Sequence, residues 1–124
     1  MEVKTPHFQQ SEFACACCGL DCIDPMFVWS LEHSRISVGI PYVVTSGVRC
    51  DKHNKDVGGA ATSAHVPREI DYPLVKCSDI RCDNMYDRKR MLQDMSKRFR
   101  HIGIAKTFIH VDDDPSKPEG IYLY

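Results

Sequence analysis

The chain has 124 residues, a length that predicts one domain with a core large enough to fold without disulfide or metal cross-links. Lys plus Arg is 16 and Asp plus Glu is 17, so the net charge of −1 argues against bulk attraction to nucleic acid or to an anionic membrane. The content of 43% hydrophobic and 27% charged residues is typical of a globular chain and excludes a mostly disordered one. We therefore expect one domain over residues 1–124, a monomer, with neither nucleic acid nor a membrane as partner.

In chain order, a cysteine-rich entry segment at residues 1–23 precedes the first predicted helix. Asp24 followed by Pro25 is typical of a helix start, because an N-cap is followed by proline at the first helical position, and Gly39 is a stop signal. The pattern then predicts a strand at 41–45, a short helix at 51–57, a loop running into a strand at 69–72, a polar loop at 76–84, a helix from 85, strands at 102–105 and 107–112, and a last strand at 121–124.

The helix that begins near residue 85 has the clearest pattern in the chain. Asp83 or Asn84 is its predicted N-cap, and its apolar face is formed by Met85, Leu92, Met95 and Phe99. We interpret the basic residues on its other faces as a solvated surface. Helices and strands together predict an α+β fold, a small antiparallel sheet flanked by helices.

Two short segments near the predicted strands hold candidate metal ligands. His65 and Asp71 flank one of them, and His110 lies in the other with Asp112 two residues on, where both side chains of a strand point to the same face. Two histidines and a carboxylate are the protein ligands of a catalytic zinc that keeps its fourth position for water. Taken alone, two histidines this far apart in the chain are more often unrelated residues.

Four segments carry a resemblance in their order and spacing: PYVVTSGVRC (41–50), HNKDVGGAATSAH (53–65), IDY (70–72) and TFIHVD (107–112). Together they resemble the zinc D-Ala-D-Ala carboxypeptidases, the M15-type peptidoglycan peptidases, and the opening FQQSEFACACCGLDCIDP resembles the short phage-type members. The resemblance implies the hedgehog/D-Ala-D-Ala-peptidase-like fold and one catalytic Zn²⁺. It also implies hydrolysis of peptidoglycan stem peptides, as a carboxypeptidase or a related endopeptidase.

Residue by residue, the resemblance implies that His65, Asp71 and His110 bind the zinc. It implies that Arg49 lies near the substrate carboxylate or the developing oxyanion, where a guanidinium can donate two parallel hydrogen bonds. Ser63 matches the serine of the motif, for which we expect hydrogen bonding around the site rather than nucleophilic attack.

The sequence departs from the family pattern in two places. Asp71 follows His65 by six residues where the family has seven, and Glu69 is an alternative ligand on the same strand face. The positions where relatives place a general base hold Thr107 and Phe108, so we name Asp112 as the base, the alternative being a strand-end carboxylate without a catalytic role. These departures leave a second hypothesis, a catalytically inactive zinc-binding module with a recognition or structural role.

The seven cysteines are the unusual feature of the composition. Because their number is odd, they cannot all form disulfides with one another within one chain. Residues 1–10 contain no apolar run of signal-peptide length, so we expect synthesis in the cytoplasm, where metal ligation or free thiols are favoured over disulfides. Their spacing suits a second, structural zinc, for which the candidate ligands are Cys15, Cys17, Cys18, Cys22 and Cys50. A disulfide and free thiols remain the alternatives there. For Cys77 and Cys82 we expect a local loop clip or free thiols.

The absence of a signal sequence in the opening segment, with its phage-type resemblance, favours an endolysin-like enzyme. We expect such an enzyme to act at the cell wall after lysis or phage-mediated delivery, with the peptidoglycan stem peptide as its partner.

Overall fold

The computed structural model describes residues 2–68 and 73–124, and the predicted strand at 69–72 lies outside the described residues. Its elements in chain order are η1 (Gln10–Phe13), α1 (Pro25–Val38), β1 (Val44–Ser46), α2 (Asp51–Asp56), β2 (Cys77–Arg81), α3 (Met85–Arg98), β3 (His101–Ile104), β4 (Phe108–Asp112) and β5 (Gly120–Leu123). None of the helices in the described part of the chain has the length and hydropathy that crossing a membrane requires.

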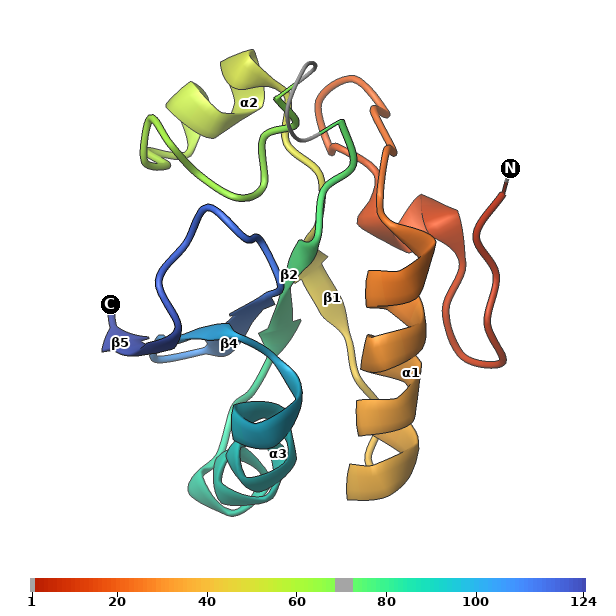
Figure 1. The fold of residues 1–124 in the computed structure, drawn as a ribbon, viewed down its shortest axis with the longest axis vertical. Helices are drawn as coiled ribbons and strands as arrows, with labels where there is room; N and C mark the ends of the chain where they lie inside the picture. Colours follow the sequence, from red (N-terminus) through yellow and green to blue (C-terminus); the bar gives the residue numbers. More distant parts are fainter. Residues whose placement is uncertain (1, 69–72) are drawn as a thin grey trace.

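The five strands form one sheet in the order β1-β2-β4-β3-β5. Neighbouring strands are antiparallel except β5, which runs parallel to β3. In Figure 1, α3 lies below the sheet and α1 beside it, whereas α2 and the loop after it lie above the sheet. The predicted α+β fold is confirmed, with a sheet that is mixed at one edge.

Both long helices begin where the sequence predicts, and α1 also ends at the predicted stop. The carboxylate of Asp24 accepts a hydrogen bond from the Met26 N–H at 2.8 Å, and Gly39 ends α1 in the left-handed conformation at φ 77°. Of the two N-cap candidates for α3, the structure selects Asn84, whose side chain accepts from the Asp87 N–H at 2.8 Å.

The predicted polar loop at 76–84 is wrong in its first half, because residues 77–81 form the strand β2 next to the centre of the sheet. Only Ile80 is a strong strand former in this run, and the buried Ser78 and Asp79 are polar. A strand with buried polar residues on both of its faces lacks the apolar alternation from which strands are recognised.

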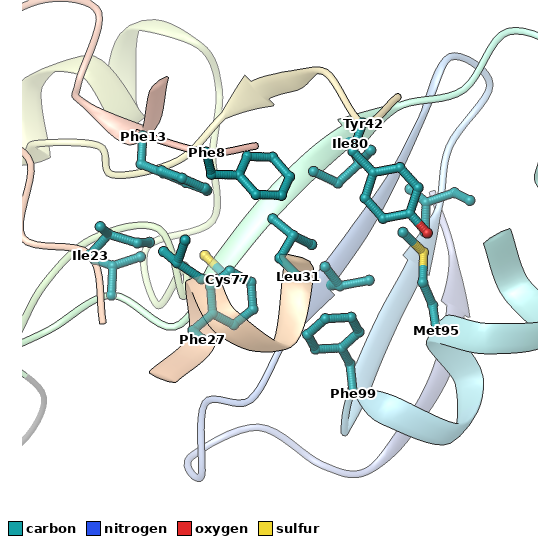
Figure 2. Packing of buried hydrophobic residues seen from close by; sticks show 14 of the residues in the cluster. Phe8, Phe13, Ile23, Phe27, Leu31, Tyr42, Cys77, Ile80, Met95 and Phe99 are labelled. Carbon is teal, nitrogen blue, oxygen red and sulfur yellow. The ribbon is translucent and has the colours of Figure 1, made fainter. Parts of the chain in front are cut away.

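The hydrophobic core lies between the sheet and the two long helices (Figure 2). The rings of Phe27 in α1 and Phe99 at the end of α3 pack with centroids 5.6 Å apart. Along β4 the side chains alternate, so Ile109 and Val111 are buried in this core while His110 points to the opposite face of the sheet. One face of the sheet therefore supplies stability, and the other is available for chemistry.

The entry segment is fixed to α1 by a buried carboxylate. Glu32 is fully buried and accepts hydrogen bonds from the Thr5 hydroxyl at 2.6 Å and the His7 N–H at 2.7 Å, while His7 Nδ1 lies 2.5 Å from its second oxygen. Burial raises the pKa of Glu32, but these hydrogen bonds outweigh it and hold the pKa below its ordinary value.

Candidate functional site

A cleft of about 760 Å³ opens on the face of the sheet that carries His110, and the loop after α2 forms part of its wall. This volume lies in the range of sites that bind small molecules or a few peptide residues. Its lining comes from all five strands, from the turn after β1 and from the loop after α2, and includes Ser46, Arg49, Ser63, His65, Asp79, His101, His110, Asp112, Lys117, Tyr122 and Tyr124.

Three buried side chains meet at the floor of this cleft. Asp79 on β2 lies directly opposite His110 on β4, and its Oδ1 is 2.9 Å from His110 Nδ1. The same oxygen is 3.3 Å from His65 Nε2, and the two imidazole rings meet edge to face with centroids 5.1 Å apart. Each of the three residues is at most 4% exposed.

His65 is held from the other side by the turn after β1. Its Nδ1 lies 2.6 Å from the carbonyl oxygen of Gly47, and its own carbonyl accepts from the Arg49 N–H at 2.8 Å. Since a carbonyl oxygen only accepts, Nδ1 carries the proton and Nε2 presents its lone pair. Burial lowers the pKa of His65, which favours this neutral form.

The arrangement fits a metal ion. Within the described part of the chain His65 Nε2 has no hydrogen-bond partner, although it faces the Asp79 carboxylate. Two electron pairs that face each other at this distance repel unless a cation lies between them. Two imidazole nitrogens and a carboxylate oxygen within 4.8 Å of one another are the donor set of a catalytic zinc with one open position.

The charges of the other two members depend on each other. Burial raises the pKa of Asp79, but the hydrogen bond with His110 and the proximity of both imidazoles outweigh it, so the pKa is well below its ordinary value. Burial lowers the pKa of His110, but the carboxylates of Asp112 and Asp79 on its two sides outweigh it and raise the pKa to about 9. The site is thus built around negative charge, as a cation site requires.

Asp112 lies behind His110, away from the shared Asp79 oxygen. Its Oδ2 is 2.6 Å from His110 Nε2 and 2.8 Å from His101 Nδ1, and its Oδ1 accepts from the Asp114 N–H at 3.2 Å. The carboxylate is fully buried. This geometry favours a residue that orients two histidines over the general base predicted from the sequence.

His101 is a cleft residue that the sequence analysis did not select. Its side chain is 16% exposed, and its ring stacks on Tyr122 with centroids 4.8 Å apart. Gly103, two residues further along β3, leaves space for the Tyr122 ring that stacks on His101, because a Cβ at Gly103 would lie 2.4 Å from Cζ of Tyr122.

Arg49 lies beside the three-residue cluster. Its Nε donates to Ser46 Oγ at 3.1 Å, its Nη1 to Asn54 Oδ1 at 3.2 Å and its Nη2 to Asp79 Oδ2 at 3.5 Å. Among the described residues, these contacts engage three of the five guanidinium N–H groups, and the side chain borders the cleft. Ser63 supports His65, because its Oγ accepts from the His65 N–H at 3.2 Å.

The structure brings together His65, His110 and Arg49, three of the residues named from the sequence, and it adds Asp79, which was not among them. The predicted ligand Asp71 and its alternative Glu69 lie outside the described residues. The sequence held a signal for Asp79, because an aspartate next to an isoleucine, the feature that favoured Asp71, also occurs at residues 79–80. Its distance of 14 residues from His65 made it look unrelated to the motif.

Four of the five predicted structural-zinc cysteines form a second cluster, Cys15, Cys17, Cys18 and Cys50. Cys22 is not a member of that group and packs partly buried against the hydrophobic core. Cys77 and Cys82 are free thiols, both buried in the core, in agreement with one of the two states expected for them.

The family model that matches this chain is described as Peptidase M15, and the match covers residues 6–112. No curated protein and no solved structure matches the chain. The matched range includes His65, Asp79 and His110, and it indicates a zinc metallopeptidase. The chain therefore belongs to the Peptidase M15 family of zinc peptidases.

Proposed function

We propose that the protein hydrolyses peptide bonds in peptidoglycan stem peptides, as a D-Ala-D-Ala carboxypeptidase or a related endopeptidase, with zinc held by His65, Asp79 and His110. The observation that carries the proposal is the meeting of these three side chains at the floor of the cleft. There His65 Nε2 faces Asp79 and has no hydrogen-bond partner in the part of the chain that the structure describes. Membership in a family of zinc peptidases supports the reaction class. When bound, zinc would supply an activated water and polarise the scissile carbonyl.

Arg49 is the residue that we assign to the substrate. Its guanidinium borders the cleft, and its contacts with Ser46, Asn54 and Asp79 hold it in place. The two N–H groups that have no partner among the described residues can donate to a terminal carboxylate or to the oxygen that becomes negative during hydrolysis. A fixed donor of this kind contributes most where charge develops, because it needs no reorganisation during the reaction.

His101 is the residue that we assign to proton transfer. Asp112 holds its Nδ1 at 2.8 Å, and a carboxylate that fixes one ring nitrogen of a histidine leaves the other available to take or give a proton. Asp112 itself is buried and already engaged, so in this proposal it orients His101 and His110. The Asp112 carboxylate then orients both the proposed zinc ligand His110 and the proposed proton-transfer residue His101.

The experiment that tests the proposal measures bound zinc and product release on the same preparation. The substrates are a stem peptide ending in D-Ala-D-Ala and purified peptidoglycan fragments, and the products are identified by mass spectrometry. Free D-alanine would show a carboxypeptidase, and cleavage inside the stem or cross-bridge would show an endopeptidase. Zinc at the cleft without hydrolysis of either substrate would overturn the proposal and favour the inactive zinc-binding module.

We further propose that the stem peptide is reached at the cell wall after lysis or phage-mediated delivery, and that the protein acts as a monomer. The low net charge of −1 supports a partner that is recognised through local contacts in the cleft. Size-exclusion chromatography with light scattering tests the oligomeric state.

A further inference from the structure

We propose a second metal site in this protein, a structural zinc bound by the thiolates of Cys15, Cys17, Cys18 and Cys50. The four residues lie outside the cleft, so this site is separate from the one to which the function is assigned. Four thiolates are a common ligand set of structural zinc sites and leave no open position for a substrate.

The spacing of the sulfur atoms is that of metal ligands. Cys50 Sγ lies 3.8 Å from Cys15 Sγ and 3.4 Å from Cys17 Sγ, and all four sulfurs lie within 4.8 Å of one another. Zinc–sulfur bonds of about 2.3 Å in a tetrahedron separate the sulfurs by about 3.8 Å. A disulfide needs about 2.05 Å, and all four cysteines are free.

The backbone of the entry segment is folded so that its three thiols converge. The Gly19 N–H donates to the Cys15 carbonyl at 2.8 Å, and the Cys15 N–H donates to the Leu20 carbonyl at 2.7 Å. Gly19 makes this reversal in the left-handed region at φ 80°, which glycine adopts without steric cost. The C-x-C-C-G segment thus forms a tight turn that brings its three sulfur atoms close to one another.

Backbone N–H groups also point at two of the sulfurs. The Cys50 N–H donates to Cys15 Sγ at 3.5 Å, and the His53 N–H donates to Cys50 Sγ at 3.4 Å. Hydrogen bonds of this kind stabilise the charged thiolate, the form that binds metal. Cys17 and Cys18 are exposed while Cys15 is buried, so an ion has a path from solvent into a cluster that is closed on its inner side.

The position of the cluster gives the metal a structural task. Cys50 follows Arg49 directly, and the preceding turn is joined to the entry segment by the Val48 N–H, which donates to the Phe13 carbonyl at 2.8 Å. The zinc would cross-link residues 15–18 to this turn, which also holds His65 through the Gly47 carbonyl. Binding energy at a structural zinc contributes directly to folding.

The test is zinc stoichiometry on the full chain, purified under reducing conditions and measured by mass spectrometry of the metal. We expect two zinc ions per chain in the wild type. Cys17→Ser combined with Cys18→Ser should leave one, and the matched control Cys22→Ser should keep two. A Cys17→Ser/Cys18→Ser protein with the wild-type zinc content would overturn the proposal, as would an intact mass showing a disulfide in the wild type.

His65→Ala separates this site from the proposed function, because it removes a cleft ligand and leaves the cysteines intact. The variant should keep one ion, whether or not the protein hydrolyses any peptide. Replacing that ion with Co²⁺ should produce thiolate-to-cobalt charge-transfer absorption, which nitrogen and oxygen ligands do not give. Cobalt bound to His65→Ala without that absorption would overturn the proposal, even if the double cysteine variant fails to fold.

Discussion

Asp79 and His110 face each other across the β2–β4 pair, with Asp79 Oδ1 at 2.9 Å from His110 Nδ1. Register fixes this relationship, because a strand pair that slipped by one residue would turn one of the two side chains to the core face. The carboxylate of the site is thus supplied by the sheet, while His65 is supplied by a loop above it.

Asp79→Asn should remove zinc from the cleft, because an amide is a much poorer ligand than a carboxylate. The loss of zinc affinity should exceed the roughly 10–100-fold that is typical of removing a residue that hydrogen-bonds to a metal ligand. Peptide hydrolysis should fall with the zinc affinity. Asp71→Asn is the matched comparison and should keep both zinc and hydrolysis. The reverse result, zinc lost only with Asp71→Asn, would restore the ligand predicted from the sequence.

Asp112→Asn separates orientation of His110 from general base catalysis. A positioning role predicts zinc binding weakened by roughly 10–100-fold and hydrolysis that is partly restored by excess zinc. A base role predicts normal zinc affinity and turnover lower by on the order of a hundredfold at every zinc concentration. Zinc titration of the apo protein, followed by turnover at saturating zinc, distinguishes the two.

His101→Gln should lower turnover by roughly 10²–10⁴-fold if this residue transfers the proton, with zinc content unchanged. His33→Gln, an exposed position on α1, is the control for a change of histidine alone and should retain wild-type kinetics. Unchanged turnover in His101→Gln would remove this residue from the mechanism.

Glu32→Gln should destabilise the protein at neutral pH by about 1.5–3 kcal/mol, the usual contribution of hydrogen bonds to a charged group. The pKa of Glu32 is lowered on folding, so its contribution to stability is present above the unfolded pKa of about 4.3 and is lost as the pH falls through the folded value. Urea unfolding should therefore show a difference between the two proteins that shrinks in acid. A difference that is constant from pH 7 to pH 3 would contradict this account.

Gly47→Ala should destabilise the fold and weaken the site together. A Cβ at this position would lie 2.6 Å from the Phe13 carbonyl oxygen and 2.7 Å from Phe13 Cα, and backbone atoms cannot move aside cheaply. The displaced turn would also move the carbonyl that binds His65 Nδ1. Thermal unfolding and zinc content measure the two effects, and wild-type values for both would show that the turn is more adaptable than the geometry indicates.

The parts of the fold that sequence reasoning predicted are those with local signals. Asp24, Pro25 and Gly39 specify the ends of α1 through capping and a left-handed stop, and neither depends on distant contacts. β2 was missed because its buried Ser78 and Asp79 look like loop residues until the strands on either side are in place. Whether such a segment forms a strand is decided by its pairing with the neighbouring strands.

The candidate site divides in the same way. His65, His110 and Arg49 were predictable because each lies within a short motif whose spacing is fixed along the chain. Asp79 was not, because the segment between it and His65 has a length that no local rule constrains. Cys22 shares the spacing of its neighbours but packs against the core, which only the folded chain reveals.

Gly103 contributes to the cleft by what it lacks, since Tyr122 fills the space that a side chain there would take. A library selected only for folding should accept alanine and serine at position 103, because the nearest atoms to the new Cβ belong to the side chains of Tyr122 and Tyr124, and a ring can turn outward where backbone cannot. A library selected for turnover should keep glycine, because the outward ring would no longer stack on His101. Mutational tolerance at a residue without a functional group would then report the shape of the cleft.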